Sequence, residues 1–389
     1  MGTTFSVLLP TRNGGKYLNS CIRSILNQQD ENVQLIISDN ANTDETLAVL
    51  DVYRGSPSVR ILRTEQVVSV TDNWNIALAA AQGDYVLMMG DDDYLLPGYF
   101  NTIRSILSRH ASPDCVLYNG YSFVAPASIA DNQTSYYSES HFHYGEDFTE
   151  EHELTHDECR SVVRDMFSYR VRIPLNMQTT LVRRQATHLV PGGIFQPPFP
   201  DHFALNSLLL TEARWVFSPH RLVVLGVSPK SFGHYVYSNQ QNAGLAYLGV
   251  DAAFPGRLPG NELLNGMHIW LEHLIRTFPE SLRGVHIDRA GYVRRQVYAW
   301  LVQWKLGMIP GGEVVKRCRQ LSTRDWTNLA ATILDGESWR RALRLFSGGH
   351  RSETEQQWQG LKKLDNVADI AGFVAWLARH SGGVFGEVI

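Results

Sequence analysis

The sequence predicts an α/β fold in which helices cover both faces of a mostly parallel sheet, followed by an α-helical C-terminal region. Over the first hundred residues, short apolar runs of strand length alternate with segments of helical periodicity. Apolar strands separated by helices are typical of a parallel sheet that is buried on both faces. From about residue 257 the strand patterns fade and helical periodicity remains. We therefore expect two domains, residues 1–256 and 257–389, with the boundary in the Pro/Gly-rich stretch 253–260.

Four strands alternate with three helices between residues 5 and 90. Leu18, Ile22 and Ile25 lie three and four residues apart, which is the spacing of one helical face. Gly55 and Gly83 follow the next two helical patterns, and glycine commonly stands at the end of a helix. The predicted strands are 5–10, 33–39, 59–64 and 84–90, and the predicted helices are 15–28, 42–55 and 71–83.

The middle of the chain is less regular. A helix is predicted at 95–110 and a strand at 114–120. Residues 121–155 are polar and rich in Tyr, Ser and His, so we expect a long loop there. Helix or strand patterns return at 156–169, 179–184, 201–213 and 221–228, and the C-terminal helices are predicted at 261–278, 290–307, 323–334 and 366–380.

The composition indicates an ordinary globular protein, because 44% of the residues are hydrophobic and 19% are charged. No run approaches the roughly 18 apolar residues of a membrane-spanning helix, and the expected location is the cytoplasm. Four scattered cysteines have no metal-like spacing and are interpreted as reduced thiols. Residues 257–389 hold 18 Lys+Arg against 13 Asp+Glu, whereas residues 1–256 hold 17 against 26. This imbalance is too mild for a nucleic-acid-binding surface.

Polar clusters follow three of the predicted parallel strands: PTRNGG at 10–15, SDNANTD at 38–44 and GDDD at 90–93. Ligands of open parallel sheets bind beyond the carboxyl ends of the strands, so these clusters should meet in space. Closely set carboxylates bind Mg²⁺ or Mn²⁺, and such an ion neutralises charge on a diphosphate leaving group. Alone, each cluster is an ordinary turn, helix cap or solvated loop, but together they predict a nucleotide-diphosphate site. The chain has neither a GxxxxGK[ST] loop nor a GxGxxG fingerprint after the first strand.

Three segments, FSVLLPTRNGGKYLNSCIRSILNQ, LIISDNANTDET and NWNIALAAAQGDYVLMMGDDDYLLP, follow one another between residues 5 and 97. In this order they resemble the GT-A glycosyltransferases of family 2. The resemblance implies a GT-A (Rossmann-like) fold and an inverting transfer of a hexosyl group from a nucleotide-diphosphate sugar. A UDP-sugar is the favoured donor, and Mn²⁺ or Mg²⁺ is the implied cofactor. The implied acceptor is a hydroxyl of a glycan or lipid-linked glycan in bacterial surface polysaccharide synthesis.

Positions that match the family's motifs take their expected roles from the resemblance. Counting back from Pro97 puts the metal ligand at Asp92. A literal DxD pairs Asp91 with Asp93, and both alignments stay open. Asn40 stands where the family has a second Asp. The donor would be bound by Pro10, Thr11, Asn13, Asp39, Asp91 and Lys230, and the metal by Asp92, Asp93 and His234.

An inverting transferase also needs a general base to take the proton of the attacking hydroxyl. The family keeps an acidic residue for this task at a helix start about a hundred residues after the triplet, and Asp201 after Pro200 matches it. Two other interpretations stay open. Asp201 could be a simple helix cap, which is a common role of Asp, or His202 could be the base.

Two other classes of function also stay open. A nucleotidyltransferase would share the sheet and the acidic site but normally carries a glycine-rich basic loop after the first strand, where only Arg12 and Lys16 are basic. A non-catalytic module would bind a sugar nucleotide or a glycan without turnover. Discriminating them requires analysis of the products.

The basic, aromatic segments 292–307 and 338–346 have two interpretations. They could form a helical bundle packed against the first domain or against a second subunit of a homo-oligomer, with the arginines at its rim. Alternatively, they could make peripheral contact with anionic lipid at the inner face of the membrane, which would suit a lipid-linked acceptor. We favour the bundle.

Overall fold

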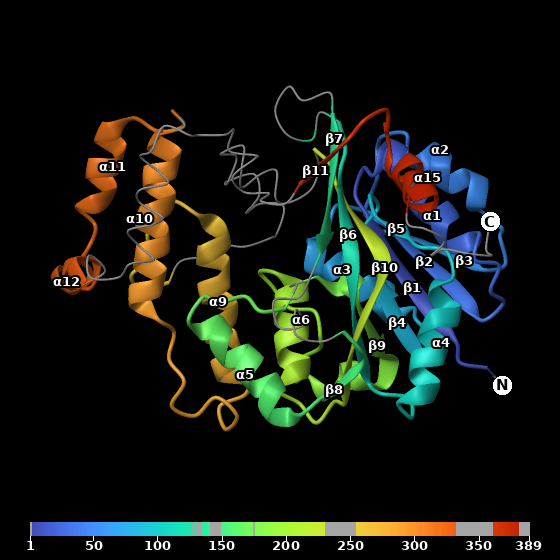
Figure 1. Cartoon of the computed structure of the whole chain (residues 1–389), viewed down its shortest axis with the longest axis horizontal. Coiled ribbons are helices and arrows are strands. Elements are labelled where there is room, and N and C mark those ends of the chain that lie inside the picture. Colours follow the sequence, from blue (N-terminus) through green and yellow to red (C-terminus); the bar gives the residue numbers. More distant parts are fainter. Residues whose placement is uncertain are drawn as a thin grey trace.

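The structure, a computed structural model, describes residues 2–126, 128, 134–140, 149–173, 176–229, 254–305, 307–331 and 361–380. Within this part of the chain, eleven strands form one sheet, and helices α9 to α12 lie to one side of it (Figure 1). The strands are β1 (Phe5–Thr11), β2 (Val33–Asp39), β3 (Val59–Arg63), β4 (Tyr85–Met88), β5 (Tyr94–Leu95), β6 (Cys115–Val124), β7 (Ser135–Ser140), β8 (His152–Leu154), β9 (Thr180–Arg183), β10 (Trp215–Val227) and β11 (Lys362–Leu364). The α-helices are α1 (Gly15–Leu26), α2 (Thr46–Tyr53), α3 (Val70–Ala79), α4 (Tyr99–Arg109), α5 (His156–Phe167), α6 (Pro200–Leu209), α9 (Glu262–Thr277), α10 (Arg289–Lys305), α11 (Gly311–Cys318), α12 (Thr323–Ala331) and α15 (Ile370–His380).

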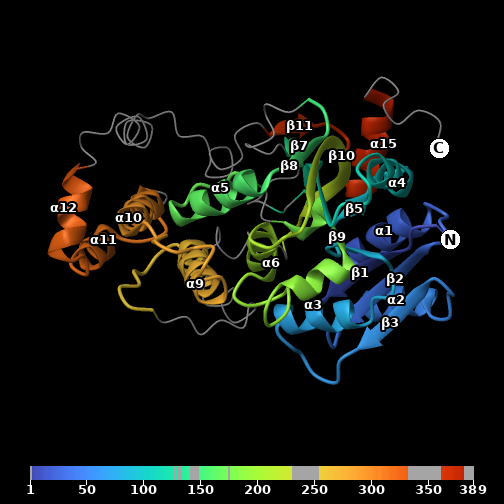
Figure 2. The same ribbon diagram turned by 90° about the horizontal axis from the view of Figure 1, so that it is seen from below.

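The first part of the sheet is parallel, as predicted. β4, β1, β2 and β3 lie side by side in that order, and Thr11 at the end of β1 is opposite Asp39 at the end of β2. Alternate residues of a strand point to opposite faces, so Val7 enters one apolar core and Leu8 the other. Helices α1, α2 and α4 cover the first face, and α3, α5 and α6 cover the second (Figure 2). The polar ends of these parallel strands therefore lie along one edge.

The remaining strands make the sheet mixed. β9 pairs antiparallel with β4 and β6, and β10 runs parallel to β6. Residues 121–155, expected to form a long loop, instead contain the end of β6 and the strands β7 and β8. β7 reads SYYSES, which lacks apolar–polar alternation, and it pairs with β6 and β11. Its structure depends on these neighbours, so the local pattern does not show it.

The helix expected at 95–110 begins later, at Tyr99. Tyr94 and Leu95 form β5, which pairs antiparallel with β10. Gly98, with φ of 80°, separates the strand from the helix, and glycine adopts this left-handed conformation without steric cost. The residues that follow the acidic triplet therefore join the sheet first.

Among the described residues, the C-terminal elements contact the first part of the chain through α9 and α10 and through β11 and α15. α9 and α10 share an apolar core with α5 and α6, in which Trp270, Tyr292 and Trp300 are fully buried. α15 packs against the sheet, where Phe373 stacks on Phe123 with 5.4 Å between the ring centroids. The buried aromatic residues of α10 support the bundle interpretation of that helix, while the boundary at 253–260 stays a prediction.

Two expectations from composition bear on the described residues. No helix among them is both long and apolar enough to cross a membrane. The four cysteines are free thiols, of which Cys21, Cys115 and Cys159 are buried and Cys318 is partly exposed. The basic segment 338–346 lies outside the described residues.

Candidate active site

The end of β1 contacts the acidic triplet directly. Thr11 is buried, and its Oγ1 donates a hydrogen bond to Oδ2 of Asp91 at 2.7 Å. Gly14 lies against the same carboxylate, because a Cβ added there would stand 2.5 Å from Asp91 Oδ2 and 2.7 Å from Thr11 Oγ1. A side chain at position 14 would therefore displace Asp91. Pro10 is partly exposed and pairs with Ser38 of β2.

The loop after β1 also contacts the loop after β2. Asn13 has a left-handed φ of 55°, and its backbone N–H donates to Oδ1 of Asn42. The side-chain Oδ1 of Asn13 accepts from the backbone N–H of Thr43 at 3.0 Å. Arg12 Nη1 donates to the carbonyl oxygen of Ala41 at 2.8 Å. The three polar clusters thus meet at one edge of the sheet, as the parallel topology predicts.

Asp39 is buried at this edge, and each of its carboxylate oxygens has a partner. Oδ1 accepts from the backbone N–H of Asn42 at 2.8 Å, and Oδ2 accepts from Nη1 of Arg63 at 2.9 Å. Arg63 ends β3, and about half of its side chain is exposed. Asp39 and Arg63 also line a cavity of about 350 Å³ together with Leu47 and Ile61. Arg63 was not among the predicted site residues, although its place at the carboxyl end of a parallel strand was a usable signal.

Asn40 has a structural role in this loop. Its Oδ1 accepts from the backbone N–H of Val68 at 2.8 Å, and its Nδ2 donates to the carbonyl oxygen of Val68 at 3.0 Å. The side chain is buried. An amide supplies both the donor and the acceptor that this pairing needs, whereas an ionised Asp supplies acceptors alone. The departure from the family's second Asp therefore fits the local structure.

Asp93 points into the protein and ties the acidic turn to β10. Its Oδ2 accepts from the backbone N–H of Gly90 at 2.7 Å, and its Oδ1 accepts from the backbone N–H of Gly226 at 2.9 Å. It is buried, and this burial, followed by repulsion from Asp92, raises the pKa of its carboxyl group to about 8. At position 226 an added Cβ would collide with the backbone oxygen of Asp92. No sequence signal pointed to Gly226.

Asp91 and Asp92 are the members of the triplet that are partly exposed. Among the described residues, no three His, Cys, Asp or Glu side chains are grouped so that they could hold a metal ion. Mg²⁺ and similar ions in nucleotide sites commonly take one or two carboxylates and complete their shell with water and phosphate oxygens. Two adjacent carboxylates at the edge of the sheet fit that donor set, whereas Asp93 has both oxygens bonded to backbone.

Asp201 lies in the first turn of α6. The N-cap position of this helix is Phe199, and Pro200 is the first helical residue. The interpretation of Asp201 as the helix cap is therefore wrong. Its Oδ1 accepts from the backbone N–H of His202 at 2.9 Å, and the side chain keeps 23% of its surface exposed. Burial raises the pKa of the Asp201 carboxyl group above its ordinary value, while nearby His202 opposes the shift.

His202 is held among aromatic rings. Its imidazole stacks on Phe199 with 4.9 Å between centroids and meets the edge of Trp270 at 5.9 Å. Burial lowers the pKa of His202 below its ordinary value, so the ring is neutral at neutral pH. The Nε2 atom lies 3.9 Å from Asp201 Oδ1, beyond hydrogen-bond distance.

The loop that leads to Asp201 is fixed to α3. Asn75 Nδ2 donates to the carbonyl oxygen of Phe195 at 3.1 Å, and the ring of Trp74 meets that of Phe195 edge-on at 5.2 Å. α3 connects β3 to β4, so the same helix borders the parallel sheet and the approach to α6. Lys230 and His234 lie outside the described residues.

Comparison with known proteins gives a family match in the N-terminal part of the chain. The family model described as Glycosyl transferase family 2 matches residues 6–166. The glycosyltransferase GlyG of Streptococcus pneumoniae is 27% identical over 124 residues, which are 32% of this chain and 41% of that protein. The abequosyltransferase RfbV of Salmonella typhimurium is 32% identical over 110 residues, 27% of this chain and 33% of that protein. The chain thus matches less than half the length of these relatives.

A second set of similarities involves Staphylococcus aureus. Poly(ribitol-phosphate) beta-N-acetylglucosaminyltransferase TarS is 27% identical over 111 residues, 28% of this chain and 19% of that protein. A crystal structure of TarS residues 1–349 with UDP aligns at a TM-score of 0.47 and 17% identity, covering 87% of this chain and 92% of that chain.

The segment that matches the family model contains all three polar clusters that meet beyond the parallel strands. It also contains β2 to β4 and all of β1 except Phe5, and these strands bring the clusters together. The segment 6–166, which carries the candidate site, thus matches glycosyl transferase family 2.

Proposed function

We propose that this protein is a metal-dependent, inverting glycosyltransferase. It moves a hexosyl group from a nucleotide-diphosphate sugar, a UDP-sugar in the first instance, to a hydroxyl of a glycan or lipid-linked glycan. The observation that carries the proposal is that the end of β1 and the loop after it contact both other polar clusters, through Thr11 and Asn13. Relatives named as an abequosyltransferase and a chondroitin synthase support a place in bacterial surface polysaccharide synthesis.

The nucleoside end of the donor is assigned to the edge formed by β1, β2 and β3. Pro10, Thr11 and Asn13 would lie along it, and Asp39 would face the base. The ion pair with Arg63 compensates the negative charge of the buried Asp39 carboxylate. The exposed half of Arg63 then offers N–H donors beside the same cavity. Asp91 would accept from the ribose, in the orientation that Thr11 fixes.

The diphosphate and the metal are assigned to the turn after β4. Asp92 would be the metal ligand, with Asp91 adjacent to it. A bound Mn²⁺ or Mg²⁺ would neutralise the charge that develops on the diphosphate leaving group. Asp93 would hold the turn in place through Gly90 and Gly226. Lys230 and His234 stay proposed contacts of the phosphate and the metal.

Asp201 is the proposed base. Its ionised carboxylate would take the proton of the acceptor hydroxyl while that oxygen bonds to the anomeric carbon. The bond from the anomeric carbon to the diphosphate oxygen breaks in the same step, and the configuration at carbon inverts. Partial burial suits this role, because a raised pKa brings the base nearer to the pH at which it works.

The test is an analysis of products with a panel of UDP-sugars and Mn²⁺, using water and short glycans as acceptors. Release of UDP together with a sugar of inverted anomeric configuration supports the proposal. Release of pyrophosphate would identify a nucleotidyltransferase. Tight binding of UDP without any turnover over the whole panel would identify a non-catalytic binding module.

A further inference from the structure

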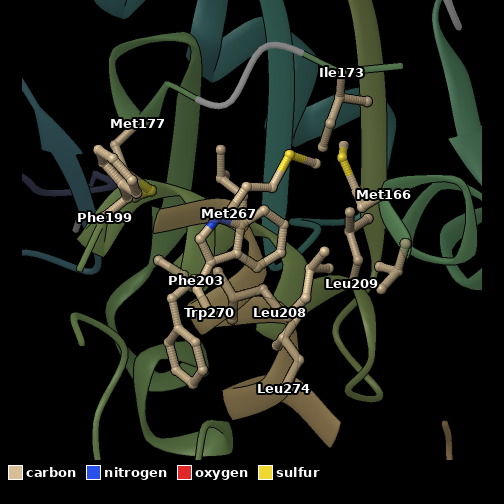
Figure 3. Close-up of a cluster of buried hydrophobic side chains, with 14 of the residues drawn as sticks. Met166, Ile173, Met177, Phe199, Phe203, Leu208, Leu209, Met267, Trp270 and Leu274 are labelled. Carbon is tan, nitrogen blue, oxygen red and sulfur yellow. The ribbon is translucent and has the colours of Figure 1, made fainter. Parts of the chain in front are cut away.

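Helix α9 covers the first turn of α6, the turn that carries Asp201. Three aromatic or imidazole rings of that turn contact α9 at successive positions along one face. Phe199 lies on Gly266, the ring of His202 meets that of Trp270 at 5.9 Å, and Phe203 stacks on His273 at 4.6 Å. Figure 3 shows Trp270 of α9 in the same apolar cluster as Phe199 and Phe203. Asp201 stands between these contacts in the sequence.

The closest of the three contacts requires glycine. A Cβ added at Gly266 would collide with Cε2 of Phe199 and stand 2.9 Å from its Cδ2 and Cζ atoms. Phe199 is itself buried and is the N-cap residue of α6. Its ring therefore has little room to retreat without moving the start of the helix. Gly266 sets the distance between the two helices at the level of Asp201.

The second contact orients the neighbour of Asp201. Asp201 Oδ1 accepts from the backbone N–H of His202, so the carboxylate and the His202 backbone move together. The His202 ring is fixed in turn between Phe199 and Trp270, and Trp270 is fully buried. A chain of contacts therefore runs from Trp270 to the carboxylate.

We propose that Gly266 and Trp270 of α9 are positioning residues for Asp201, which makes α9 part of the active site's supporting structure. The inference rests on the proposed function, in which Asp201 is the base. α9 lies outside the segment that matches the family model. The proposed dependence of Asp201 on α9 is therefore not part of what the family resemblance implies. Displacing a base by about 1 Å can reduce the rate on the order of a hundredfold, because the reacting atoms leave their productive geometry.

The experiment compares wild type with Gly266→Ala, Trp270→Phe and Asp201→Asn. The matched control is Gly312→Ala on α11, because a Cβ at Gly312 meets nothing within 4 Å. We would measure kcat and KM for UDP release from the UDP-sugar that wild type hydrolyses fastest with Mn²⁺, as a function of pH. A thermal-shift titration with UDP and Mn²⁺ would measure binding at the proposed donor site, to which α9 contributes no proposed residue.

We expect kcat of Gly266→Ala to fall more than tenfold, with KM and the UDP-dependent thermal shift within twofold of wild type. The acid limb of its pH profile should move to lower pH, because a displaced Asp201 gains solvent. A packing role alone would leave that limb in place. Gly312→Ala should match wild type. An unchanged acid limb, or a loss in kcat of tenfold or less in a variant that keeps its UDP response, would overturn the proposal.

If Gly266→Ala loses the UDP-dependent thermal shift, the variant has failed to fold. Trp270→Phe then tests the proposal by the same criteria, except that the loss in kcat has to exceed threefold. Failure of the underlying function gives a different result. Asp201→Asn would then release UDP at the wild-type rate, or wild type would not release UDP at all, and the positioning proposal would fall with it.

Discussion

Thr11 and Asp91 are 80 positions apart in the chain and share a hydrogen bond of 2.7 Å. The bond joins the end of β1 to the acidic turn after β4, and Thr11 is also the register partner of Asp39 at the end of β2. One buried hydroxyl thus lies between two acidic positions of the candidate site. The proposed donor site includes both ends of this hydrogen bond, and substituting Thr11 tests its role.

Thr11→Val removes the hydroxyl and keeps the shape of the side chain. We expect a loss of about 1 kcal/mol in the free energy of unfolding, because Asp91 loses a charge-assisted hydrogen bond at a partly buried position. The affinity for UDP with Mn²⁺ should fall several-fold, since Asp91 is no longer oriented. Urea unfolding and calorimetric titration measure the two effects. Unchanged UDP affinity would separate Asp91 from donor binding.

Asp201→Asn removes the proposed base and still offers an oxygen that can accept from the His202 N–H. We expect kcat for UDP release to fall by at least about a hundredfold, which is the usual contribution of a general base. UDP binding should stay within twofold of wild type, as should kcat of the control Glu212→Gln, whose side chain is 86% exposed. Full activity in Asp201→Asn would remove this residue from the mechanism.

The pH dependence of wild-type kcat follows from the same carboxyl group. Burial raises the pKa of Asp201 above the ordinary 3.8, and the base acts when it is ionised. The rate should therefore fall as the pH decreases through a value above 3.8. A profile that stays flat down to pH 4 in a folded protein would contradict the assignment.

The ion pair between Asp30 and Arg104 predicts how the stability of the fold depends on pH. The guanidinium of Arg104 donates to both carboxylate oxygens of Asp30 and holds the pKa of that carboxyl below 3.8. A lowered pKa stabilises the folded state above pH 3.8, and this stability is lost as the pH falls through the folded-state pKa. Asp30→Asn should lower the unfolding free energy by about 1 kcal/mol at pH 7 and flatten its decline in acid. An equal decline in both proteins, measured by urea unfolding, would contradict this.

Phe373→Ala tests the return of the C-terminal helix to the sheet. The ring is fully buried and contacts Phe123, Tyr121 and Tyr137. Truncating a buried Phe typically costs about 3–5 kcal/mol, because apolar contacts are lost and a cavity remains. Urea unfolding should show such a loss, whereas Arg379→Ala at the exposed end of the same helix should change stability by less than about 0.5 kcal/mol. A loss below 1 kcal/mol for Phe373→Ala would mean that α15 does not pack there in solution.

The meeting of the polar clusters was predictable because the topology of parallel strands decides it. Strands buried on both faces carry a local apolar signal, and their carboxyl ends share one edge. The roles within the acidic triplet were not predictable, since three adjacent carboxylates have the same chemistry. The turn geometry decides that Asp93 faces the backbone N–H groups of Gly90 and Gly226, and one of these lies 133 positions away.

The strands and contacts that the sequence analysis missed depend on distant partners. β7 lacks its own alternation and forms between β6 and β11. Leu95 was expected to begin the helix 95–110, but it pairs with Val223 of β10, as Tyr94 pairs with Val224. Such pairings are decided by tertiary structure, which overrides local propensity.

The most direct test of the donor site is calorimetric titration of UDP into wild type and Asp92→Asn, each with Mn²⁺ and with EDTA. We predict that Mn²⁺ strengthens UDP binding to wild type at least tenfold, that Asp92→Asn abolishes this gain, and that Asp157→Asn on the exposed start of α5 keeps it. Equal UDP affinity of wild type in Mn²⁺ and in EDTA, or an undiminished Mn²⁺ effect in Asp92→Asn, would contradict a metal–diphosphate site at the turn after β4.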